Sequence, residues 1–262
     1  MYIFEVTTPG TWLDYPDRDW AWKIGGLLRN LQAQFYEANT ALNLFEQAQS
    51  QQSFRFTREQ WEADSERRSQ IRREVEAELG FDFSHHSWER ISHEADVRFK
   101  REKWGSGCVP RELERNVVSI LARAFVYALD GFDKFLAVLA AEPDAPAKLG
   151  ELSARVGSIF PDLRGVRNST QHLEDRARGL GAGRNPKPMT LQPVENRLIS
   201  APGGGVLVLN SLNGNRFGCT MSDGHYGEVE ISPQSLQHLS SLLHEVLQCF
   251  RWKGPVQHAP SV

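Results

Sequence analysis

The segment from residue 113 to residue 139 constrains the fold more than any other part of this chain. Its apolar residues recur at intervals of three or four, which places them on one face of a helix. Pro110 stands just ahead of the segment, where a first helical turn tolerates its missing N–H group. The pattern predicts a long buried helix at the centre of a bundle. The apolar face consists of Leu113, Val117, Ile120, Leu121, Ala124, Phe125, Ala128, Phe132, Phe135 and Leu139.

Helical spacing also occurs in three stretches that precede this segment. Residues 20–45 carry apolar side chains along one face and predict one long amphipathic helix. In the second stretch Thr57 stands three residues before Gln60, as in a capping box, and dense Glu and Arg predict a solvated helix that ends at Gly80. The third stretch, residues 87–104, repeats the pattern and stops at a Gly-Ser-Gly sequence, which we take as a boundary.

The second half of the chain changes from helices to strands. A short helix is expected over residues 149–156, and a further helix over residues 166–180 after a turn marked by Pro161 and Gly165. A loop rich in Gly, Pro and Arg follows. Val and Leu runs, alternating residues and two turn dipeptides then predict a three-stranded antiparallel meander. The expected strands are 203–209, 216–221 and 226–231, separated by Asn213-Gly214 and Asp223-Gly224.

Ser232-Pro233 begins a last helix with leucines on one face. The sequence therefore predicts a mainly α fold: a helical bundle with an N-terminal helical extension and a small three-stranded antiparallel meander before a C-terminal helix that packs back on the bundle. We expect an N-terminal helical region over 1–106, a helical core over 107–190, and the meander with the last helix over 191–262.

Composition narrows the class of protein. The net charge of −3 does not favour a protein that coats nucleic acid through bulk positive charge, and 40% hydrophobic residues suffice for a buried core. Cys108, Cys219 and Cys249 are odd in number and have no CxxC spacing, so we expect neither disulfides nor a zinc site. No leader-like or membrane-spanning pattern is evident. A cytoplasmic protein without a metal or cofactor is expected.

Residues 167–172 read Arg-Asn-Ser-Thr-Gln-His and are the strongest candidate for chemistry. Arg167 and His172 are five positions apart, so on a regular helix they would diverge. They could converge if Arg167 lay just outside the helix, with Asn168 and Gln171 as an N-terminal capping pair. The free N–H groups of such a helix end, together with Arg and His, suit a phosphate.

The pattern Arg167-Asn168-x-x-x-His172 resembles the signature motif of the HEPN superfamily, helical-bundle proteins many of which are ribonucleases in defence and toxin systems. The preceding Ala128-Leu129-Asp130-Gly131-Phe132 resembles part of the long helix that precedes the motif in that family. The likeness covers roughly residues 110–181. It implies metal-independent cleavage of RNA, in which the 2′-hydroxyl attacks the neighbouring phosphate and leaves a 2′,3′-cyclic end, and it implies a homodimer with the two motifs facing each other.

The resemblance also implies roles for the three motif residues: His172 as acid or base, Arg167 as stabiliser of charge on the phosphate, and Asn168 as a residue that holds the site in shape. From the residues themselves we expect Asp175, one turn further, to orient the His172 ring. The remaining candidates flank the motif. They are Glu174 and Arg176 in support, and Arg164, Arg178, Arg184 and Lys187 along an RNA backbone.

One other reading of the function remains open at this point. The bundle could be a catalytically silent module that binds RNA or dimerises, while the N-terminal helices bind a regulatory protein. Convergence of Arg167 and His172 at a solvent-open cleft would separate this reading from a ribonuclease.

Elsewhere, the histidines at 85, 86 and 93 lack metal-binding spacing, and the glycines at 203–205 precede a strand, which predicts a turn and not a phosphate loop.

Overall fold

The computed structural model describes residues 1–52, 57–80 and 84–261. These form eight helices and nine short strands, and the expected mainly α fold, with a small antiparallel sheet before a C-terminal helix, is confirmed. Contacts divide the chain into two compact units, residues 1–46 with 119–262 and residues 47–118. This division places the first 46 residues with the second half of the chain, whereas the sequence suggested boundaries at 106/107 and 190/191.

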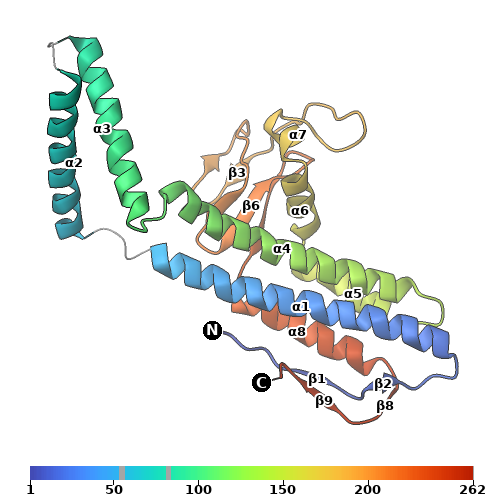
Figure 1. The fold of residues 1–262 in the computed structure, drawn as a ribbon. Helices are drawn as coiled ribbons and strands as arrows, with labels where there is room; N and C mark the ends of the chain where they lie inside the picture. The colour runs from blue at the N-terminus through green and yellow to red at the C-terminus, as the bar shows by residue number, and fades with distance from the viewer. Residues whose placement is uncertain (53–56, 81–83, 262) are drawn as a thin grey trace. The chain divides into compact units, whose positions relative to one another are not determined.

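The larger unit is built on long helices (Figure 1). It contains most of α1 (Arg18–Gln52), the C-terminal part of α4 (Arg111–Ala141), α5 (Lys148–Ile159) and α8 (Pro233–Gln248). Helix α8 packs on α5, as expected, and Arg155 Nη2 on α5 pairs with Glu245 Oε1 on α8 at 2.6 Å. The core of the larger unit includes Ile24, Leu28, Phe35, Phe45, Phe125, Leu129, Phe132, Leu239, Leu243 and Leu247.

Helix α4 is buried along a slightly different face than the sequence suggested. Leu113, Val117 and Ile120 were expected inside, but they are 55%, 47% and 52% exposed. The buried positions start instead at Val118 and Ala122, so the covered face is displaced by one residue along the first turns. Apolar residues stand at adjacent positions such as Val117 and Val118, so tertiary packing decides which of the two is buried.

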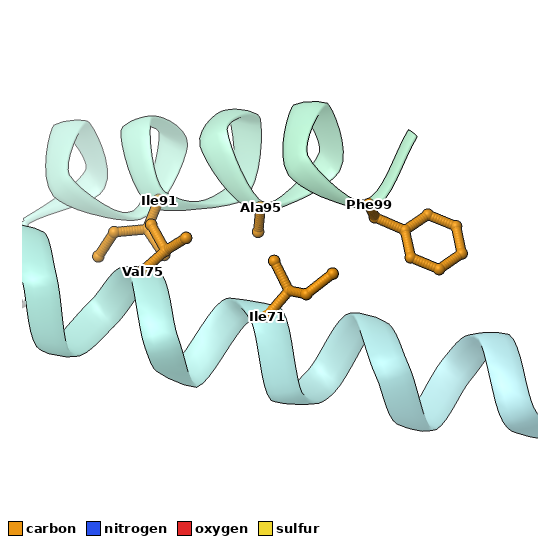
Figure 2. Packing of buried hydrophobic residues seen from close by; sticks show 5 residues of the cluster. All are labelled: Ile71, Val75, Ile91, Ala95 and Phe99. Atoms are coloured by element: carbon orange, nitrogen blue, oxygen red, sulfur yellow. The ribbon is translucent and has the colours of Figure 1, made fainter. Parts of the chain in front are cut away.

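The smaller unit contains a helical hairpin of α2 (Arg58–Leu79) and α3 (His85–Gly105). The predicted capping box is confirmed, because the Thr57 side chain accepts from Gln60 N while the Gln60 side chain accepts from Thr57 N. A thin apolar seam joins the two helices, and ion pairs such as Arg67 with Glu102 flank it. Figure 2 shows the seam residues: Ile71, Val75, Ile91, Ala95 and Phe99.

A three-stranded antiparallel sheet precedes α8, with the strands in the order β5 (Ser211–Asn213), β6 (Arg216–Thr220) and β7 (Tyr226–Glu230). The second and third strands match the prediction to within one residue. The first strand was expected at 203–209, which was wrong. Gly204 and Gly205 have positive φ angles, which an extended strand does not have. Val208 does bond with Thr220 of β6, but Asn210, with φ 46°, interrupts the extended backbone between Val208 and β5.

Three short antiparallel pairings complete the described structure. The hairpin β3 (Val194–Glu195) with β4 (Ser200–Ala201) precedes the meander. The two ends of the chain pair with each other, because β1 (Val6–Thr8) aligns with β9 (Gln257–Ala259) and β2 (Trp12–Leu13) aligns with β8 (Trp252–Lys253). These ribbons lie beside the N-terminal end of α1 (Figure 1). Among the described helices, none combines the length and apolarity needed to span a membrane.

Candidate functional site

The Arg167–His172 segment lies on α6 (Leu163–Gln171) and at its junction with α7 (Leu173–Ala177). The single helix expected over 166–180 was wrong. Helix α6 starts earlier, and it ends because His172 has a non-helical backbone with φ −114° and ψ 45°. Gly165, interpreted as a turn residue, is instead inside α6, where a Cβ would clash with Met221 of the loop after β6.

The early start of α6 changes the position of the motif relative to the helix end. Arg167 and Asn168 are inside α6, so Asn168 is not an N-terminal cap and the expected capping pair with Gln171 is absent from the described structure. Asp162 occupies the N-cap position, but its Oδ2 accepts from the N–H of Glu228 on β7 at 3.1 Å. The N–H groups of the first turn of α6 belong to residues 163–165, and that of Leu163 already donates to the carbonyl oxygen of Phe160 at 3.1 Å. Arg167 therefore does not lie just outside a helix start, and the phosphate site expected from that position was wrong.

Two side chains hold the guanidinium of Arg167. Its Nε lies 2.9 Å from Oδ2 of Asp130 on α4, and its Nη1 donates to Asn168 Oδ1 at 3.1 Å. Asp130 is only 6% exposed and also pairs with Lys134, whereas 22% of the Arg167 side chain remains exposed. Within the described ranges, Nη2 of Arg167 makes no hydrogen bond. The arginine is thus fixed by α4 and Asn168 while one donor nitrogen remains available.

Sequence reasoning did not assign a role to Asp130, although a signal was present. Asp130 is an acidic residue inside the buried periodicity of α4, between Leu129 and Phe132. Buried carboxylates are rare unless they are paired, so such a position predicts a cationic partner. Asp133 lies close by, and its own burial and the negative charge of Asp130 raise the pKa of its carboxyl.

His172 is a solvent-exposed ring. Its side chain is 59% exposed, and Nδ1 lies 3.9 Å from Oε1 of Glu174. Asp175, which was expected to orient the ring, pairs instead with Arg178 at 2.5 Å. His172, Glu174 and Asp175 each place one potential ligand atom within 4.8 Å of the others, but that is one ligand short of a structural zinc site.

Arg176 was expected to support the motif, but the structure buries it. Its side chain is 1% exposed, so it does not present its charge to solvent beside His172. Nε donates to Ser169 Oγ at 3.2 Å, and Nη1 donates to the carbonyl oxygens of Leu180 and Gly181. Arg176 therefore ties α6 to the loop that follows α7.

The four residues expected along an RNA backbone are all exposed: Arg164, Arg178, Arg184 and Lys187. Arg178 is engaged with Asp175. Arg184 and Lys187 lie on a loop closed by the hydrogen bond from Gly181 N to Lys187 O, and neither has an ion pair in the part of the chain that the structure describes. The positive charge of this loop is free to meet an anion.

Arg167 and His172 share one short segment without touching. Among the described residues, no hydrogen bond or ion pair joins them. One chain thus supplies a fixed, partly exposed guanidinium and an exposed imidazole. This pair can neutralise an anion and exchange a proton.

A buried thiol lies beneath the segment. Cys219 on β6 is 1% exposed, its Sγ contacts the carbonyl oxygen of Val166 at 3.6 Å, and burial raises the pKa of the thiol to about 12. Because the thiolate is the reactive form, iodoacetamide at mildly alkaline pH is expected to modify exposed Cys108 and leave Cys219 unmodified until the protein is unfolded. Mass spectrometry of tryptic peptides measures this. Equal modification of both residues in the native protein would contradict the burial.

Comparison of the chain with protein-family models, with curated proteins and with solved structures gives no match.

Proposed function

We propose that this protein is a metal-independent endoribonuclease of the HEPN type, with Arg167, Asn168 and His172 as its catalytic residues. The observation that carries the proposal is the fixation of Arg167 by the buried carboxylate of Asp130, on the same short segment that carries the exposed His172. An arginine held by a buried acid on a neighbouring helix has a defined position, which charge stabilisation in a transition state requires. An exposed histidine can reach a substrate.

The proposed reaction needs one base, one acid and a cation. A His172 ring removes the proton of the 2′-hydroxyl, the 2′-oxygen attacks the adjacent phosphorus, and the bond to the 5′-oxygen breaks as that oxygen receives a proton. Arg167 stabilises the negative charge on the non-bridging oxygens through its available donor. In a homodimer, a second copy of the segment would supply a second His172, so that one ring acts as base and the other as acid.

The proposed setting is a cytoplasmic defence or toxin system of a prokaryote, where a ribonuclease must be restrained. A regulatory protein would bind the N-terminal helices. Trp61 on α2 and Trp88 on α3 are 63% and 47% exposed, which supports a role of the hairpin in contacts with a partner.

The test is incubation of the purified protein with mixed RNA in the presence of EDTA. We expect cleavage that EDTA does not inhibit and products that end in 2′,3′-cyclic phosphates, identified by mass spectrometry of the fragments. The same protein treated with RNA lacking the 2′-hydroxyl at a cleaved position should leave that position intact. Cleavage that yields 3′-hydroxyl ends, or intact RNA at every protein concentration, would refute the proposed reaction.

A silent interaction module is the alternative function. It is favoured by the engagement of two of the three guanidinium nitrogens of Arg167 within its own chain, and by the lack of a described contact between Arg167 and His172. Intact RNA together with a stable dimer, measured by light scattering, would support this alternative.

A further inference from the structure

A pocket in the larger unit is both aromatic and basic. It has a volume of about 370 Å³ and is lined by the start of α1 and by the terminal strands β2 and β8. Such a volume is in the range of sites for small ligands. None of its lining residues carries a carboxylate, and it shares no residue with the Arg167–His172 segment. Its aromatic and cationic lining includes Trp12, Trp22, Arg18, Arg29 and Lys253.

Two tryptophans of this pocket are largely exposed. Trp22 on α1 is 77% exposed, and Trp12 on β2 is 60% exposed. The Trp12 ring lies against the backbone of Gly254, where an added Cβ would be 2.9 Å from Cζ3, so one face of this ring is supported and its orientation is restricted. Indole rings exposed beside a pocket offer flat surfaces on which a nucleobase can stack.

The cations of the pocket are available for an anion. Neither Arg18 nor Arg29 has an ion pair with any residue that the structure describes, and Lys253 has only a loose contact with Asp14 at 3.5 Å. The guanidinium of Arg29 lies along Gly25, where an added Cβ would be 3.5 Å from Nη1. Three cations without a lining carboxylate are complementary to phosphate.

We propose that this pocket binds a nucleotide, with the base stacked on Trp22 or Trp12 and the phosphate held by Arg18 and Arg29. The combination of stacking surfaces and unpaired cations fits a base joined to a phosphate better than it fits either group alone. This binding site is separate from the Arg167–His172 segment and does not depend on RNA cleavage. The nucleotide has two possible sources, a free mononucleotide or one unit of an RNA strand.

The experiment is a binding titration with the full chain carrying His172→Ala, in EDTA, so that RNA stays intact. The probes are AMP, inorganic phosphate and a short fluorescein-labelled oligouridylate, followed by calorimetry and fluorescence anisotropy. We expect Trp22→Ala and Arg29→Gln each to weaken binding by roughly tenfold or more. AMP that binds as tightly as the oligonucleotide identifies a free nucleotide as the ligand, whereas an oligonucleotide that binds at least tenfold more tightly identifies an RNA strand.

Matched variants on the other unit control for nonspecific effects. Trp61→Ala removes a tryptophan that is 63% exposed, and Arg73→Gln removes an exposed arginine, so both should leave binding unchanged. The proposal is overturned if neither nucleotide probe binds, if Trp22→Ala and Arg29→Gln bind as the parent does, or if inorganic phosphate binds as tightly as AMP. Because His172 is absent throughout, loss of binding here and loss of RNA cleavage are measured independently.

Discussion

His172→Ala is expected to reduce the rate of RNA cleavage by at least about 100-fold. The substitution removes the group proposed to take the proton from the 2′-hydroxyl and to return one to the leaving oxygen, while Arg167 and its contact with Asp130 remain in place. The ring is 59% exposed, so its removal should leave the thermal midpoint of unfolding close to that of the parent protein. Single-turnover cleavage of a labelled RNA measures the effect.

His258→Ala is the matched control for this prediction. The two histidines have similar surroundings, since His258 is 58% exposed and lies 3.3 Å from Glu5, while His172 lies 3.9 Å from Glu174. His258 is on β9 and is not part of the motif. If the His172→Ala and His258→Ala variants cleave RNA at the same rate, His172 is not the acid or base of the reaction.

Several helix ends were predictable from the sequence because their signals are local. The pairing of Thr57 with Gln60, the stop at Gly80 and the start at Ser232-Pro233 depend on residues within one turn of each other, and the structure confirms all three. In contrast, the pairing of β1 with β9 joins residues at opposite ends of the chain. Nothing in the periodicity of either strand specifies such a partner.

The geometry of the candidate site depends on tertiary contacts, which explains why its residues were found but its local structure was not. A projection at ~100° per residue assumes a continuous helix, and the break at His172 invalidates it. Gly165 looks like a turn residue in the sequence, yet it lies inside a helix, where the side chain of Met221 occupies the space that a Cβ would need. Asp130 became interpretable only when its contact with Arg167 was known, because an acidic residue within an apolar helix predicts a partner without naming it.

Arg176→Ala is expected to lower the free energy of unfolding by about 3 kcal/mol, the largest effect on stability among the polar residues of the motif region. The substitution leaves the carbonyl oxygens of Leu180 and Gly181 and the hydroxyl of Ser169 without their donor in a buried environment. A cavity replaces the side chain, which is 1% exposed. For a chain of this size, the thermal midpoint should fall by roughly 10 °C, which differential scanning calorimetry measures.

Arg178→Ala separates this effect from a general loss of positive charge. Arg178 is two residues further and 65% exposed, and its pair with Asp175 is at the surface, so its removal should change the free energy of unfolding by less than about 1 kcal/mol. Equal midpoints for the two variants would show that Arg176 does not support the fold. Because Arg176 is bonded to the start of the loop that carries Arg184 and Lys187, its removal should also loosen the placement of these two cations. Arg176→Ala is therefore expected to weaken RNA binding at temperatures well below its midpoint, although its own side chain cannot reach the RNA.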